Sequence, residues 1–147
     1  MLDQIKKTIL TRYKLEDSKG VFLSIFDAKG NLLSSQGVVQ TDKDLGSVVE
    51  KLYKGFAEDM LKNIGLITVD IVTSMFEETN ITKIPLTSVK QYGFYMIDDN
   101  HKSGVILPNT KGIADAKNAL YVLKQKYGLT GKVNVFLFTT DRLIVTN

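Results

Sequence analysis

Apolar residues recur along this chain with two different periods, and the longer period predicts three helices. Side chains at three- and four-residue spacing predict a helix over residues 2–14 and a second, continuous helix over residues 42–64. A third apolar stripe predicts a helix over residues 113–126. The expected end signals are a cap at Thr41 or Asp42 for the second helix, and Gly65 and Gly128 after the second and third helices.

Alternating and β-branched stretches predict strands between these helices. Asp27 to Asn31 predicts a hairpin turn, because Gly and Asn tolerate a positive φ angle. The polar triplet 139–141 is expected to join two final strands, and residues 77–91 are expected to be irregular, as functional or mobile loops often are. Asp70 lies within a predicted strand, where we expect it to be exposed. The predicted strands are 20–27, 31–39, 66–76, 94–97, 104–107, 133–138 and 142–145.

The order of these elements predicts the fold class. Most neighbouring strands are joined by hairpins, which favours an α+β domain with a mainly antiparallel sheet flanked by about three helices. The chain has 147 residues, which is typical of one domain, so we expect a single domain over 1–147. A chain of this size buries roughly 70% of its unfolded surface and needs no disulfide or metal for stability.

Composition excludes several kinds of chemistry. The sequence has no cysteine, which removes disulfides, thiolate metal sites and cysteine nucleophiles. Its one histidine, His101, rules out a His-rich zinc site within one chain. We therefore predict no catalytic residue, no metal site and no cofactor, although enzymatic activity stays open. The cysteine-free sequence, which begins without a signal peptide, agrees with a cytoplasmic location.

The charge pattern argues against nucleic acid as a partner, and the lack of a long apolar run argues against a membrane span. The net charge is +3, and only Arg12 and Arg142 are arginines. Base readout favours the arginine fork, and the lysines here are spread along the chain. No apolar run approaches the roughly 18 residues of a membrane span.

Two polar segments are candidate sites on residue type alone. Asn109, Thr110 and Lys111 precede the third predicted helix, and helix N-termini with a nearby lysine attract anions. A simpler explanation is that Asn109 or Thr110 is an ordinary helix cap. The segment from Asp98 to His101 has oxygen ligands suited to a hard cation, but its composition is also typical of a plain turn.

Two longer stretches resemble a known family. The first is GVFLSIFDAKGNLLSSQG over residues 20–37, which is followed by the long helix. The second is YGF at 92–94, then GVILP at 104–108 and a helix. Their order and spacing resemble the AMMECR family, named for a candidate protein of the AMME syndrome region and including the A component of the AmmeMemoRadiSam system. The similarity runs from about Lys19 to Phe138, and the resemblance implies an antiparallel sheet flanked by helices.

The chain departs from the family at its characteristic LRGCIG motif. That motif aligns with residues 32–37, where only Leu32 and Gly37 keep the pattern. Leu33 replaces the arginine and Ser35 replaces the cysteine. Ser34, Ser35 and Gln36 are therefore candidate ligand-binding residues at the end of a strand, and a solvated strand edge is the simpler explanation.

The resemblance implies a partnership with Memo-like and radical-SAM-like proteins. We thus expect a divergent AMMECR-like binding or accessory module. One alternative is an enzyme or enzyme subunit with a polar pocket near Ser35. Another is a profilin-like or longin-like sensor or dimerisation domain, since such folds share the strand, turn, strand and helix of residues 20–64, and a homodimer therefore stays open.

Overall fold

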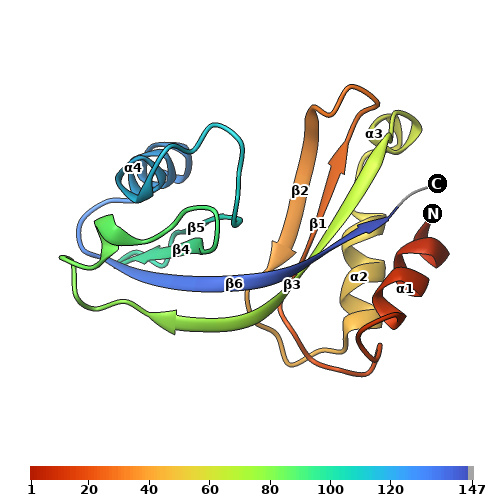
Figure 1. Cartoon of the computed structure of the whole chain (residues 1–147), viewed down its shortest axis with the longest axis horizontal. Helices are drawn as coiled ribbons and strands as arrows, with labels where there is room; N and C mark the ends of the chain where they lie inside the picture. The colour runs from red at the N-terminus through yellow and green to blue at the C-terminus, as the bar shows by residue number, and fades with distance from the viewer. Residues whose placement is uncertain (146–147) are drawn as a thin grey trace. The chain divides into compact units, whose positions relative to one another are not determined.

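The computed structural model describes residues 1–145, which divide into two compact units. Unit 1 comprises residues 1–72 and the end of the chain from Asp141, and unit 2 comprises residues 73–140. Figure 1 labels the elements, which in chain order are α1 (Leu2–Leu10), β1 (Val21–Phe26), β2 (Leu32–Val38), α2 (Leu45–Lys54), α3 (Glu58–Lys62), β3 (Leu66–Glu77), the short 3₁₀ helix η1 (Ile84–Leu86), β4 (Gly93–Asp98), β5 (Ser103–Ile106), α4 (Ala116–Tyr127) and β6 (Val133–Val145).

The strands confirm the predicted α+β class. Within residues 1–145 they form an antiparallel sheet of six strands in the order β2-β1-β3-β6-β4-β5. The two long strands β3 and β6 contribute residues to both units. Because the units share strands in this way, the expectation of a single domain over 1–147 stays a prediction.

The predicted helix over residues 42–64 is wrong in its continuity and its cap. α2 ends at Lys54, and the N–H of Gly55 donates to the carbonyl oxygens of Lys51 and Leu52 at 3.1 Å each. Gly55 costs a helix about 1 kcal/mol relative to alanine, and the chain leaves the helical path there so that Phe56 enters the core. α3 begins at Glu58. The described chain therefore has four α-helices, and about three were expected.

The final two predicted strands are one strand, β6. The polar triplet 139–141 was expected to form a turn, but it continues the strand, and side chains within it have partners. In unit 2, the Thr139 hydroxyl is 2.7 Å from that of Thr73 and 2.6 Å from that of Ser74. In unit 1, Asp141 accepts hydrogen bonds from Arg12 at 2.6 Å and from Tyr13 at 3.0 Å.

The core of unit 1 lies between two helices and one face of its strands. α1 and α2 lie side by side against β1 and β3 (Figure 1). The residues that alternate along β1 toward this face are Val21, Leu23 and Ile25, and their neighbours on β3 are Ile71, Val69 and Ile67. We call this the helix face of unit 1, and the other side of the same strands its opposite face.

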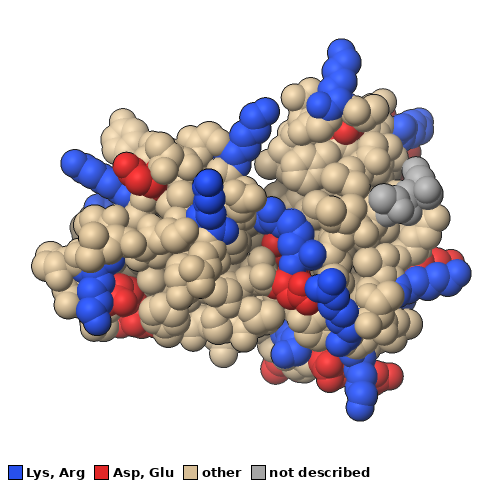
Figure 2. Space-filling model, in the orientation of Figure 1, with Lys and Arg blue, Asp and Glu red and all other residues tan. Residues whose placement is uncertain are grey.

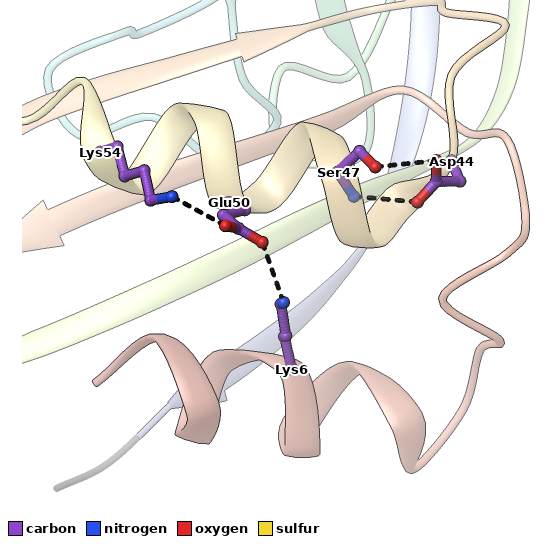
Figure 3. A network of polar contacts seen from close by, with 5 residues as sticks. All are labelled: Lys6, Asp44, Ser47, Glu50 and Lys54. Carbon is purple, nitrogen blue, oxygen red and sulfur yellow. Dashed lines mark hydrogen bonds and ion pairs between the residues drawn. The ribbon is translucent and has the colours of Figure 1, made fainter.

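Polar contacts at the surface cap α2 and link it to α1 (Figure 3). Asp44, rather than Thr41 or Asp42, caps α2 by accepting from the N–H and the hydroxyl of Ser47 at 2.9 Å each. These bonds lower the pKa of Asp44. Glu50 contacts Lys54 at 2.8 Å and Lys6 of α1 at 3.2 Å, and both contacts lower the pKa of its carboxyl group. Exposed pairs of this kind stabilise a fold only slightly, so they orient the helices more than they hold them.

Unit 2 has a separate apolar core. β4 pairs with β5 on one side and β6 on the other, and α4 and η1 pack on these strands. α4 begins after a cap at Asp115 and ends, as predicted, at Gly128, whose φ angle is +64°. The buried residues of this core are Ile84, Phe94, Met96, Ala116, Ala119, Leu123, Leu129, Val135 and Leu137.

Two glycines test this packing in opposite directions. A side chain at Gly37 of β2 would overlap the Val21 carbonyl oxygen, so we expect Gly37→Ala to lower the free energy of unfolding by about 1–3 kcal/mol. At Gly46 in α2 the nearest atoms would be 3.4 Å away, so Gly46→Ala should raise it by up to about 1 kcal/mol. Urea denaturation of the two variants measures both changes, and a stabilised Gly37→Ala would contradict the packing described.

Candidate functional site

The three polar residues at the aligned motif position lie on β2 and point to different faces. Ser35 pairs with Ser24 of β1, whereas Gln36 and Ser34 pair with Leu23 and Ile25. Side chains alternate along a strand, so Ser35 lies on the opposite face while Ser34 and Gln36 lie on the helix face. A side chain at Gly55 would be 3.3 Å from Gln36 Oε1, which places the Gln36 amide at the end of α2. The structure thus separates the three residues that the sequence grouped together.

Ser35 begins a row of hydroxyl groups across three strands of unit 1. Its Oγ atom is 2.9 Å from Ser24 Oγ, and either atom serves as donor. Ser24 in turn pairs with Thr68 of β3. Ser24 and Thr68 are buried, while Ser35 on the edge strand β2 is exposed. The row therefore runs from the protein interior to an accessible end.

A charged pair lies on the same face, two residues further along β3. The prediction that Asp70 is exposed is wrong, because its side chain is 0% exposed. Arg142 Nε of β6 donates to Asp70 Oδ1 at 2.9 Å, and the Arg142 side chain is 35% exposed. An ionised carboxylate is buried at high cost unless a cation and hydrogen bonds compensate it, and this guanidinium supplies both.

These five residues form the polar face of unit 1, which we define as Ser24, Ser35, Thr68, Asp70 and Arg142. The set offers hydroxyl donors and acceptors beside a salt bridge, which suits the binding of a small polar ligand.

The residues of the polar face that sequence reasoning missed leave only weak signals in the sequence. Ser24 is a polar residue within an apolar strand. Thr68 is a β-branched residue of the kind common in strands, so its position carries no special signal. Arg142 is one of two arginines in the chain, which could have drawn attention to it. Its pairing with Asp70 spans 72 positions along the chain, and no local pattern reveals such a contact.

The second candidate segment lies in a turn of unit 2. Asn109 has a φ angle of +56°, and its N–H donates to the Val89 carbonyl oxygen at 2.8 Å. The Thr110 hydroxyl donates to the Leu107 carbonyl oxygen at 2.7 Å, and Lys111 is exposed. Neither Asn109 nor Thr110 caps α4, so that expectation is wrong. Asn109 lies in one turn and Lys111 in the next, and the helix starts only at Ala116.

The N-terminus of α4 is already capped by its own side chains. Asp115 Oδ1 accepts from the N–H of Asn118 at 2.8 Å, and Asn118 Oδ1 accepts from the N–H of Ala114 at 3.1 Å. This arrangement resembles a capping box, except that Asn118 accepts from the residue before the N-cap and not from the N-cap itself. It occupies backbone donors that an anion would otherwise use.

The acidic turn after β4 has the contacts of a structural turn. Asp98 is buried, and its Oδ1 accepts from the N–H groups of Asn100 and Lys102 at 2.9 Å each. Its Oδ2 accepts from the N–H of Thr130 at 3.2 Å. Burial opposes ionisation of this carboxyl group, but the three N–H donors outweigh it and lower the pKa of Asp98. Across residues 1–145, no three acidic or histidine side chains are grouped as a metal site would require.

Charged side chains are dispersed over the visible surface of the protein. Lys and Arg side chains are scattered over the face shown in Figure 2, with Asp and Glu side chains among them. This distribution agrees with the dispersed lysines of the sequence and forms no continuous basic band on that face. None of the helices between residues 1 and 145 has the length and apolar character needed to cross a membrane.

The salt bridge of the polar face yields a stability prediction. Arg142→Ala removes the cation beside the buried Asp70 carboxylate, so we expect the free energy of unfolding to fall by about 3 kcal/mol, near the lower end for buried pairs because Arg142 is partly exposed. Arg12→Ala, which removes the exposed contact with Asp141, is the matched control and should cost less than about 1 kcal/mol. Equal losses in urea denaturation would contradict the buried role of Asp70.

Comparison with known proteins supports the fold alone. No protein-family model matches the sequence, and no curated protein matches it significantly. A solved structure, that of the uncharacterized protein PH0010 from Pyrococcus horikoshii, is similar, with a TM-score of 0.74 and 16% sequence identity. The similarity covers 96% of this chain and 85% of that chain. At this identity, the two proteins share a fold, and the chain's function has to be argued from its own residues.

Proposed function

We propose that this chain is a divergent AMMECR-like binding or accessory module that works with Memo-like and radical-SAM-like proteins in the cytoplasm. The two matching sequence stretches support the proposal, as does the antiparallel α+β fold that the resemblance implies. Nucleic acid is not part of the proposal, because the charges on the visible face are dispersed.

The observation that carries the proposal is which positions of the aligned motif keep their residues. Gly37 is retained, and β2 needs a glycine there because a side chain would overlap the Val21 carbonyl oxygen. The arginine and cysteine positions are Leu33, which packs against the core of unit 1, and Ser35, which bonds Ser24. The scaffold position is kept while the charged and thiol groups are lost. This pattern supports binding without catalysis.

Direct binding to the expected partners tests the proposal. Purified Memo-like and radical-SAM-like proteins from the same organism would be titrated with this chain in a calorimeter. We expect at least one to bind saturably, because an accessory module acts through a stable contact. A lack of binding to either protein, alone or mixed, would contradict the proposed function.

A second candidate function is an enzyme or enzyme subunit that binds a small polar ligand near Ser35. The buried hydroxyl groups of Ser24 and Thr68, next to the Asp70–Arg142 pair, favour it. The profilin-like or longin-like alternative has less support within unit 1, because α1 and α2 both contribute to the helix-face core and neither contributes to the polar face.

Because Ser35 and Gln36 lie on opposite faces of β2, substituting each in turn tests whether a ligand binds at the polar face. In a thermal-shift screen of small polar metabolites, any stabilising compound would be tested again with Ser35→Ala and with Gln36→Ala. We expect Ser35→Ala to remove the shift, because its hydroxyl lies on the polar face. Gln36→Ala should keep the shift, because its side chain lies on the helix face. Loss of the shift in Gln36→Ala alone would reject the polar face as the ligand site.

A further inference from the structure

β2 forms an open edge of the sheet in unit 1. It pairs with β1 alone and stands at the end of the strand order within residues 1–145 (Figure 1). None of its residues is buried, and the aliphatic side chains of Leu32 and Val38 are 53% and 36% exposed. The backbone edge of β2 is therefore accessible.

Strand pairing shows which backbone groups of β2 point to this open edge. The N–H of Val72 donates to the Gly20 carbonyl oxygen at 2.8 Å, so the residue before β1 directs its backbone groups to β3. Backbone groups alternate in direction along a strand, and the first residue of β1 therefore faces its partner on β2, Val38. By the same alternation, the N–H and C=O groups of Ser35 and Gly37 point away from β1 to the open edge.

The usual protections of a sheet edge are few on β2. Natural edges carry lysine, proline, inward-pointing charges or bulges that prevent pairing with another chain. Residues 30–41 contain no charged residue and no proline. A register shift between Ile25 and Phe26 distorts the strand pair next to the hairpin turn, whereas residues 34–38 stay in regular register with β1. This regular part of β2 is therefore open to a further strand.

We propose that β2 pairs in antiparallel fashion with β2 of a second copy of this chain, centred on Ser35. The outward N–H and C=O groups of Ser35 bond those of Ser35 in the second copy across a twofold axis. This register places position 32 of each copy opposite position 38 of the other. Both ends of the contact then carry an exposed aliphatic side chain from each copy, Leu32 or Val38, which loses exposed surface on pairing.

The composition of β2 suits a second copy better than a segment of another protein. A twofold axis brings central residues close to their own counterparts, where a charge would repel itself, and residues 30–41 carry none. The flanking charges have both signs at each end, Asp27 and Lys29 before this stretch and Asp42 and Lys43 after it. An added peptide is selected through its side chains, and the uncharged residues 34–37 give little basis for such selection.

Self-pairing also limits the size of the assembly. The contact uses the same edge in both copies, so it closes as a dimer. Pairing of β2 with β5, the strand at the other end of the order, would leave a free edge on each side and build open-ended chains. A closed dimer is therefore the assembly that covers β2 without further growth.

Hydrogen exchange on the native chain tests the contact directly. One strand pair buries little area, so we expect sedimentation velocity to show a monomer–dimer equilibrium between about 10 µM and 1 mM. The amide proton of Ser35 should exchange about tenfold or more faster on dilution, because it faces solvent in the monomer. The amide proton of Gln36, which points to β1, is the internal control and should exchange slowly at every concentration.

Two variants at Ser35 separate the backbone contact from the side chain. Ser35→Pro removes the outward N–H without removing a bond to β1, so this variant should stay monomeric. Ser35→Ala keeps the N–H and should dimerise like the native chain. Both variants lose the hydroxyl bond to Ser24, so a difference between them isolates the backbone group.

Several outcomes would overturn the inference. A native chain that is monomeric at about 1 mM contradicts it, as does a dimer in which the Ser35 amide proton exchanges as fast as in the monomer. Native-strength dimerisation of Ser35→Pro also contradicts it, and the exchange result decides if that variant unfolds. If the Ser35 amide proton is protected only after a Memo-like or radical-SAM-like protein is added, the edge has another occupant. Dimerisation through β2 is independent of the proposed function, so its failure leaves that function standing.

Discussion

The alternation of side chains along β1 and β3 is the constraint on which unit 1 depends. Within unit 1, β1 and the part of β3 up to Val72 are largely buried on both faces, so each residue must suit the face it reaches. Apolar residues meet α1 and α2 on the helix face, while Ser24 and Asp70 find polar partners on the opposite face. A shift of one residue in β3 would place Asp70 against the helices and Ile71 beside Arg142. The polar pairs therefore add to the register that the apolar core specifies.

Local patterns in the sequence predicted most of the fold. The strand pairs around the two hairpins, the α+β class and the glycine that ends α4 all depend on residues close together in the chain. The break between α2 and α3 was missed, because the apolar stripe continues across Gly55 and only packing shows where Phe56 goes. The continuity of β6 was missed for the same reason, since the partners of Thr139 and Asp141 are distant in sequence.

The candidate site was predicted in one position and missed in four. Ser35 was predicted through its alignment with a cysteine of the AMMECR motif. Ser34 and Gln36 were predicted with it, because a linear motif does not show which face of a strand each side chain reaches. Ser24, Thr68, Asp70 and Arg142 join Ser35 only through strand pairing. The buried carboxylate of Asp70 has a guanidinium partner, so the polar face is the part of unit 1 that depends on polar pairing as well as on apolar packing.

The placement of the C-terminal end of β6 has a consequence for how the protein is made. Leu143 and Val145 belong to the same apolar core as Ile5 and Ile9 of α1. During synthesis, the first 72 residues therefore leave the ribosome long before the strand that completes their core exists. Contacts of such long sequence separation slow folding, and apolar surface stays exposed until they form. Unit 2, whose residues are contiguous, has no such delay, and is the part of the chain equipped to fold first.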